Sequence, residues 1–301
     1  MKHITAGLTA TAALISLATT PAFAQRDFSD VEITTTKVTD GIYMLRGAGG
    51  NIGLSTGDDG AFVIDDQFAP LSKKIMKAIK KTTDDDVAFV LNTHFHGDHT
   101  GGNEAFGKAG AHIVAHDNVR KRLKEGSNRG GRTTPPAPDD ALPVITFAKS
   151  MTFHWNDRTI HVWHPGHAHT DGDAIVFFKD LNVVHMGDVF FNGGYPFIDV
   201  NGGGDLAGYI ATHEKVLTKI DAETKIMPGH GALASKADLQ KTVDMLKDAT
   251  ALVQAQIDAG LDEDATVAAD PLAKYNDDWG QGFINGERMV RTIYGELTAE
   301  E

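Results

Sequence analysis

The stretch that decides the fold is His94-Phe95-His96-Gly97-Asp98-His99, which directly follows an apolar run over 87–91 that is typical of a buried strand. Side chains alternate along a strand, so His94 and His96 are predicted to point to the same side as the strand runs out. Gly97 is expected to let the backbone turn, so that Asp98 and His99 are directed at a second position nearby. Four potential ligands in so short a stretch exceed the needs of one tetrahedral ion and suit two adjacent ions.

Three later stretches offer further ligands, which the first cluster needs in order to complete two metal sites. Each follows the predicted end of a strand, where α/β proteins gather their functional sites. The simpler explanations are a turn for Gly-Asp after a strand, and a solvated loop rich in histidine for the first cluster. The three stretches are HPGHAHTDGD over 164–173, MGD over 186–188 and PGHG over 228–231.

The composition limits both the ligands and the partners. The chain has 301 residues, no cysteine and 14 histidines, so any metal site must use imidazole and carboxylate groups. Its formal net charge is −13, and an acidic surface repels the phosphates of nucleic acids. We therefore expect a small-molecule substrate and no nucleic-acid partner. The sequence does not indicate an oligomeric state.

The first 24 residues resemble a secretory signal peptide. Lys2 supplies a positive start, an apolar stretch follows over 4–17, and small residues precede a cleavage point after Ala24. The apolar stretch is too short for a membrane anchor, which is the alternative. We expect export to the periplasm, no membrane association after cleavage, and one hydrolase domain over 25–301.

Hydrophobic periodicity predicts two series of strands, each ending in helices, on either side of a loop over 125–140. Before the loop, the predicted strands are 31–33, 42–45, 51–55, 61–64, 87–91 and 112–115, and the predicted helices are 70–81 and 117–124. After it, the predicted strands are 144–147, 152–155, 159–163, 174–178 and 182–185, and the predicted helices are 206–220 and 235–259. Two similar halves that pack sheet against sheet, with helices outside, would explain this order.

The motifs HFHGDH, GHAHTDGD, GD and PGHG, in this order, resemble those of the metallo-β-lactamase superfamily over about Val31 to His230. The resemblance implies an α/β fold, the αββα sandwich of two pseudo-equivalent halves, with a dinuclear metal site at one edge. By position, it assigns His94, His96 and His169 to the first metal, Asp98, His99 and His230 to the second, and Asp188 to a bridge between them or to the second metal.

Two assignments have alternatives. The family usually reads PGHT, whereas two residues intervene here, so His167 could replace His169 as the ligand. His169 is preferred because the family's Thr-Asp-Gly-Asp follows it directly. Asp65 or Asp66 resembles the buried aspartate that supports the site in this family, and Asp65 could fix the tautomer of a ligand histidine. A turn at the end of a strand is the alternative for this pair.

The resemblance implies two Zn²⁺ ions, although an aspartate-rich set without cysteine also accepts iron or manganese. Water bridging two such ions loses its proton near neutral pH, and the hydroxide attacks a carbonyl. Asp98 is assigned the catalytic role of orienting this hydroxide and then carrying a proton. Because this chemistry cleaves β-lactams, lactones, thioesters and esters, we expect a metal-dependent hydrolase, with β-lactams among its candidate substrates.

Departures from the family keep other functions open. The most numerous zinc β-lactamase subclass has a cysteine at the position of Asp188 and a lysine three residues later, where this chain has Phe191. The ligand set is more similar to that of the hydroxyacylglutathione hydrolases. One alternative is therefore a lactonase or thioesterase whose substrate is no antibiotic. Another is a periplasmic metal-binding protein without turnover, which would leave the second ligand set unexplained.

Three loops are candidates for substrate contacts. The glycine-rich stretch 47–51 is either a mobile flap over the site or a hairpin turn. Aromatic residues at 190, 191 and 195–197 either line an apolar pocket or pack beneath their loop. Arg129 and Arg132 either meet an anionic substrate or are simply solvated.

Overall fold

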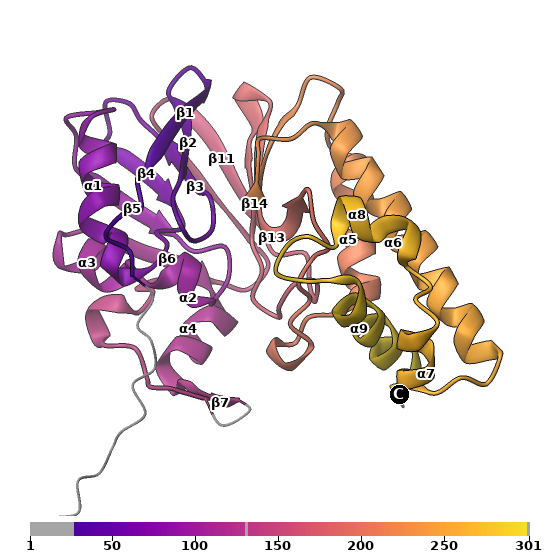
Figure 1. Cartoon of the computed structure of the whole chain (residues 1–301). Coiled ribbons are helices and arrows are strands. Elements are labelled where there is room, and N and C mark those ends of the chain that lie inside the picture. Colours follow the sequence, from indigo (N-terminus) through magenta and orange to yellow (C-terminus); the bar gives the residue numbers. More distant parts are fainter. Residues whose placement is uncertain (1–26, 130–131, 300–301) are drawn as a thin grey trace, which may run out of the picture. The chain divides into compact units, whose positions relative to one another are not determined.

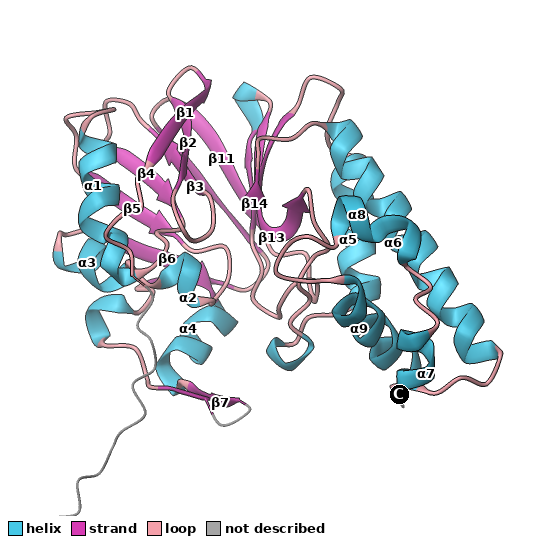
Figure 2. Ribbon diagram, in the orientation of Figure 1, coloured by secondary structure: helices cyan, strands magenta, loops and turns pink. Residues whose placement is uncertain are grey.

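Two β-sheets lie face to face within residues 31–299, and helices cover the outer side of each sheet (Figure 1). In this computed structural model, residues 27–129 and 132–299 are described, so the predicted signal peptide over 1–24 lies outside the described residues. The arrangement is the αββα sandwich that the sequence predicts, and Figure 2 shows the strands as its two inner layers.

The first sheet has strand order β1-β2-β3-β4-β5-β6-β9. Its strands are antiparallel from β1 to β4 and parallel from β4 to β9. Helices α1, α3 and α4 lie on its outer side in Figure 1. The strands are β1 Thr34–Thr39, β2 Ile42–Arg46, β3 Ile52–Ser55, β4 Ala61–Ile64, β5 Val87–Leu91, β6 His112–His116 and β9 Ile145–Phe147, and the helices are α1 Ser72–Lys80, α2 Gly97–Thr100, α3 Asn103–Lys108 and α4 Asp117–Glu125.

The second sheet has strand order β10-β11-β12-β13-β14, in which only β13 and β14 are parallel. Helices α5, α6 and α9 cover its outer side (Figure 1). The strands are β10 Ser150–Trp155, β11 Arg158–Trp163, β12 Ile175–Phe178, β13 Val183–Asn192 and β14 Lys225–Gly231, and the helices are α5 Leu206–Leu217, α6 Lys236–Asp258, α7 Glu263–Ala268, α8 Ala273–Trp279 and α9 Gly286–Thr298.

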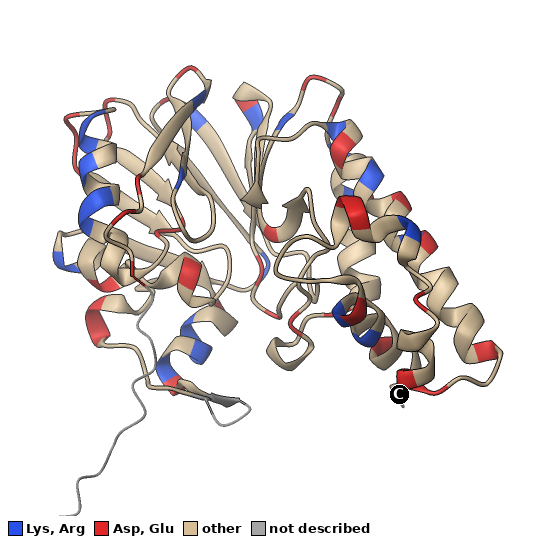
Figure 3. Ribbon diagram, viewed as in Figure 1, with Lys and Arg blue, Asp and Glu red and all other residues tan. Residues whose placement is uncertain are grey.

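Apolar side chains fill the space between the sheets and the space beneath the second helix layer. The inner core joins residues of both sheets, among them Ile42 and Phe62 from the first and Val162 and Val176 from the second. A second core packs the second sheet against α5, α6 and α9. Charged residues lie mainly on the outer helices and loops (Figure 3). Among the described residues, no helix is both long and apolar enough to cross a bilayer.

The long helix α6 shows why its segment is helical. Ser235 caps its start, because the Ser235 hydroxyl accepts from the backbone N–H of Asp238, whose carboxylate accepts in return from the backbone N–H of Ser235. The predicted apolar stripe is buried at Leu239, Val243 and Leu246, which supports the helix through packing on the second core.

Three predictions of local structure are wrong. The first strand is Thr34–Thr39 rather than 31–33, because an edge strand built of exposed threonines has no apolar alternation to reveal it. The predicted loop over 125–140 contains a hairpin of β7 Ser127–Arg129 and β8 Arg132–Thr134. Strand β9 follows this loop but pairs with β6, so the boundary between the halves falls after Phe147.

Candidate metal centre

The first cluster lies where β5 ends and the short helix α2 begins. Asn92 extends the strand with a backbone hydrogen bond to Val114, and its side chain pairs with that of Asn103. Gly97 starts α2, and a Cβ built there would have no atom within 4 Å. The backbone turns here and Asp98 and His99 reach a second position, as predicted, although neither a positive φ nor a close contact makes glycine necessary at this residue.

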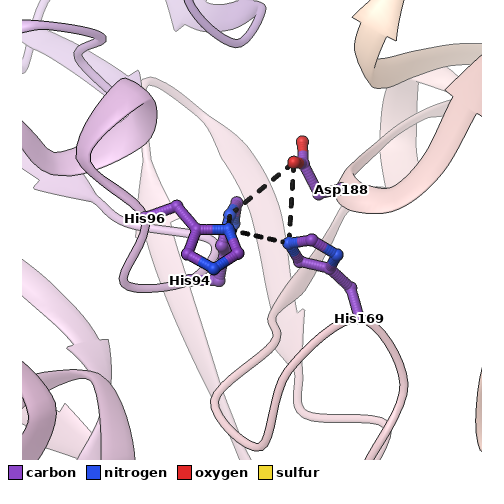
Figure 4. A group of neighbouring side chains, drawn as sticks. All are labelled: His94, His96, His169 and Asp188. Carbon is purple, nitrogen blue, oxygen red and sulfur yellow. Dashed lines mark hydrogen bonds and ion pairs between the residues drawn. The ribbon is translucent and has the colours of Figure 1, made fainter. Parts of the chain in front are cut away.

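Ring nitrogens of three histidines meet a carboxylate at a first position, called the first group and made of His94, His96, His169 and Asp188. Figure 4 shows the imidazoles pointing toward one another, with Asp188 facing them. His96 Nδ1 lies 3.0 Å from both His94 Nε2 and His169 Nε2. Asp188 Oδ2 lies 3.8 Å from His94 Nε2 and 3.6 Å from His169 Nε2. Ligands of a tetrahedral zinc ion lie about 3.3 Å apart, so these separations suit one ion.

A second group, made of Asp98, His99 and His230, lies beside the first. His230 Nε2 is 3.4 Å from Asp98 Oδ2, and His99 Nε2 is 3.7 Å from the same oxygen. The other carboxylate oxygen of Asp188, Oδ1, is 3.0 Å from His99 Nε2 and 3.4 Å from His230 Nε2. Asp188 therefore turns one oxygen toward each group.

Two buried atoms in these groups, His99 Nε2 and Asp188 Oδ1, lie 3.0 Å from each other, yet neither makes a hydrogen bond of acceptable geometry with any described residue. An unpaired buried polar atom is costly unless something else satisfies it. Both atoms face the space between the ligand sets, where a cation would satisfy them. The donor set of imidazole and carboxylate fits zinc and also admits iron or manganese.

Protonation differs between the two groups. In the first, burial lowers the pKa of His169 to about 4 and the pKa of His94 well below its ordinary value, so both rings are neutral and can donate a lone pair. In the second, burial acts to lower the pKa of His230, but the carboxylates of Asp188 and Asp98 raise it to about 9. A cation bound at the second group would displace the proton that His230 otherwise holds.

The ring nitrogens that face away from the groups are held by other partners. His99 Nδ1 lies 2.8 Å from a carboxylate oxygen of Asp65, which agrees with the prediction that Asp65 supports a ligand histidine. His96 Nε2 lies 2.8 Å from a carboxylate oxygen of Asp199. Such contacts fix the tautomer and orientation of a ligand histidine. The two remaining contacts are His169 Nδ1 with the Phe197 carbonyl at 2.7 Å and His94 Nδ1 with the Thr93 hydroxyl at 3.1 Å.

Sequence reasoning missed Asp199. It also left two choices open, Asp65 or Asp66 as the supporting aspartate and His167 or His169 as the ligand, and the geometry decides both. Asp199 belongs to no motif, and only its place eleven residues after Asp188 in the same aromatic loop could have drawn attention to it. Asp66 accepts a hydrogen bond from the backbone of Gly102 and touches no ring of either group. His167 is exposed and outside both groups, whereas His169 is fully buried within the first.

The glycine-rich loop between β2 and β3 presses against the second group. The backbone N–H of Gly50 donates to the Asp98 carbonyl at 3.0 Å, and a Cβ at Gly50 would lie 2.1 Å from the His99 ring. Asn51 donates its backbone N–H to the Gly229 carbonyl at 2.7 Å. These contacts favour a fixed turn at the site over a mobile flap.

The aromatic residues after Asp188 divide into two roles. Phe190 and Tyr195 are buried in the core, as the packing alternative requires. Phe191 instead stacks on the His230 ring with 5.1 Å between ring centres, and Phe197 stacks on the His96 ring at 5.9 Å. These two rings form an apolar wall around the ligand sets. The side chains of Arg129 and Arg132 lie outside the described part of the structure.

Comparisons with known proteins bear on the same segment. The sequence pattern of the Metallo-beta-lactamase superfamily matches residues 45–230. A hydroxyacylglutathione hydrolase of Polaromonas sp. is 32% identical over 150 residues, which is 47% of each chain. One of Nitrosococcus oceani is 31% identical over 168 residues, covering 54% of this chain and 55% of the relative. The chain thus spans about half the length of the curated relatives it matches.

The fold also matches a solved structure. A metallo-beta-lactamase from Pontibacter korlensis aligns with a TM-score of 0.61 and 19% identity, covering 72% of this chain and 100% of that chain. Similarity at this identity concerns the fold alone. Because the family pattern covers more than half of the sequence and includes both ligand sets, this chain belongs to the metallo-beta-lactamase superfamily.

Proposed function

We propose that this protein is a hydrolase that binds two metal ions, preferably zinc, and cleaves an acyl bond of a small molecule with water. The observation that carries the proposal is the position of Asp188, whose two carboxylate oxygens face two separate sets of imidazole nitrogens. A carboxylate between two cations is a natural bridge, whereas a single structural ion would leave the second set without a purpose.

His94, His96 and His169 would hold one ion, Asp98, His99 and His230 the other, and Asp188 would join both. When bound, a metal pair supplies Lewis acidity, which polarises a carbonyl and lowers the pKa of water. The protein's own contribution is to hold the ligand rings in fixed tautomers through Asp65, Asp199 and the Phe197 carbonyl, so that little reorganisation is needed during the reaction.

Asp98 is suited to handle the proton. Its side chain is 26% exposed, against 5% for Asp188, so it can reach a water molecule and a leaving group. Burial acts to raise its pKa, but His99 and the hydrogen bond with His230 hold the pKa of Asp98 below the ordinary value. The ionised carboxylate can accept a proton from water and later pass it on.

We favour a thioester or ester over a β-lactam as substrate. The curated relatives are named as hydroxyacylglutathione hydrolases. β-Lactam antibiotics carry a carboxylate, and Phe191 stacks on His230 where a cation would be needed to pair with it. Lactones and β-lactams remain candidates of lower rank. The signal-like sequence over 1–24 supports a periplasmic location for this activity.

Metal analysis combined with a hydrolysis panel tests the proposal. We expect about two equivalents of transition metal per purified chain, and hydrolysis of acyl thioesters and aryl esters that stops after chelation and returns with Zn²⁺. A lactone and a chromogenic cephalosporin belong in the same panel. A protein that holds both ions yet hydrolyses none of these substrates would instead support the metal-binding protein without turnover.

A further inference from the structure

A cavity of about 300 Å³ lies next to the first group, between the start of α2, helix α4 and the β7–β8 hairpin. This volume is at the lower end of the range for ligand pockets. Phe95 and His96 line it on the side of the metal centre, and Leu123, Pro135 and Ala137 line it on the other side. Nothing in the proposed function uses this space.

The cavity adjoins the candidate metal centre through one shared residue, His96. His96 belongs to both, because its Nδ1 faces His94 and His169 while its side chain also lines the cavity. Gly97 is the next lining residue, and a Cβ built there would have no atom within 4 Å, so the space beside the backbone is open at this point. A substrate with its carbonyl at the ligand sets could therefore extend past His96 into the cavity.

The described charged residues that line the cavity do not favour an anion. Arg122 lines it, but the guanidinium group binds Asp171 through two hydrogen bonds of 2.8 and 2.6 Å and lies 4.9 Å over the Phe95 ring. Its charge is thus balanced by Asp171. Glu125 at the rim is exposed and adds a negative charge. The apolar contacts come from Phe95, Leu123, Pro135 and Ala137, and the uncharged polar residues Ser127 and Thr134 complete the hairpin side of the wall.

We propose that this cavity is the subsite for a neutral, apolar acyl chain of the substrate, with Phe95, Leu123 and Ala137 as specificity-determining residues. The proposal rests on the proposed function and narrows its substrate class to medium-chain acyl compounds. Burial of each methylene group contributes about a fourfold gain in binding. A chain ending in a carboxylate loses this gain, because a buried charge without a partner is costly.

The test compares wild type with Ala137→Phe, which fills the cavity, and with Ala109→Phe, which changes an exposed alanine after α3. The substrates are acetyl, butanoyl, hexanoyl and adipoyl thioesters of one thiol. In wild type, we expect kcat/KM to rise from acetyl to hexanoyl by at least about tenfold and to fall again for adipoyl. Ala137→Phe should abolish the rise, so that hexanoyl is turned over no faster than acetyl, whereas Ala109→Phe should keep the wild-type dependence on chain length.

A binding measurement separates this inference from the proposed function. Titration calorimetry of the metal-loaded protein with the hexanoyl and acetyl amides of one amine, used in place of the thioesters, measures the affinity of the subsite without turnover. Tighter binding of the hexanoyl amide that Ala137→Phe removes supports the subsite even if no thioester is hydrolysed. Turnover and amide binding that are both independent of chain length would overturn the subsite and leave the hydrolase intact.

Two further outcomes are decisive. If Ala137→Phe fails to fold, Leu123→Glu replaces it, because a charge on the wall should also remove the preference for hexanoyl over acetyl. If acyl length has no effect but lengthening the thiol does, and Ala137→Phe removes that effect, the cavity holds the leaving group and the assignment to the acyl chain is wrong.

Discussion

The two halves of the sandwich contribute to the candidate metal centre in different ways. The first half supplies four ligand side chains from one stretch, 94–99, at the end of β5. The second half supplies His169, Asp188 and His230 from three places, the loop before β12, strand β13 and strand β14. Asp188 and His230 come together only because β13 and β14 pair in parallel. One half encodes its ligands locally, and the other depends on the whole fold.

The largest expected effect comes from the residue that joins both groups. Asp188→Ala should lower kcat/KM more than about 100-fold and reduce the content of both ions, because each group loses one oxygen ligand. His169→Ala should chiefly reduce the first ion, since His169 belongs to the first group alone. Metal analysis and thioester hydrolysis measure both effects, with exposed Asp40→Asn as the control. Full metal content in Asp188→Ala would show that the carboxylate is no ligand.

The next largest effect is expected when the carboxylates that support ligand histidines, one from each half, are changed and the metal affinities of the two variants are compared. Asp65→Asn replaces the charged acceptor beside His99 by a neutral amide, and Asp199→Asn does the same beside His96. Each change should weaken metal binding by about 10- to 100-fold, as is usual for residues that orient a ligand histidine. Competition with a chelator measures the affinities. If only the Asp65 variant loses affinity, the carboxylates from the two halves do not support the ligand histidines of the first half in the same way.

A smaller effect tests the close packing of the glycine-rich loop. Gly50→Ala places a methyl group against the His99 ring, so the ring or the loop must shift, and kcat/KM should fall roughly tenfold. Gly295→Ala on α9, outside the site, is the matched control, because its added methyl group has free space around it. Circular dichroism verifies that both variants fold. Equal activity of the two variants would mean that the loop yields at little cost.

The smallest effect concerns acid stability and arises in the second half. His213 on α5 is fully buried, and burial lowers its pKa to about 4, below the unfolded value of about 6.5. Protonation therefore favours the unfolded chain, so its contribution to stability is complete above about pH 6.5 and is lost as the pH falls toward 4.

When the pH is lowered from 7 to about 5.5, we expect the unfolding free energy of the wild type to fall by roughly 1 kcal/mol more than that of His213→Leu. Urea denaturation of both proteins at the two pH values measures the difference. A wild type and variant that lose equal stability over this interval would show that His213 stays partly hydrated in the folded protein.

The sequence predicted what is local and apolar, and it missed what depends on distant pairing. The strand before His94 and the long helix α6 follow from periodicity, and PGHG drew attention to His230. Asp199 reaches His96 from 103 positions away, so no spacing rule finds it. The threonine-rich strand β1 and the short helices α7 and α8 lack the alternation or stripe that would have revealed them. Helix α9 carries an apolar stripe at Met289, Val290 and Ile293, which periodicity could have found and the prediction missed.

Asn51 connects the two halves directly beside the ligands. Its backbone N–H donates to Gly229, and its side-chain amide donates to the carbonyls of Pro228 and Gly231 at 2.8 and 3.0 Å. None of these bonds uses a ligand atom, so withdrawing the ions leaves the frame in place. We therefore expect reloading to be limited by the arrival of ions rather than by refolding, and a protein starved of metal to regain its occupancy as soon as supply returns.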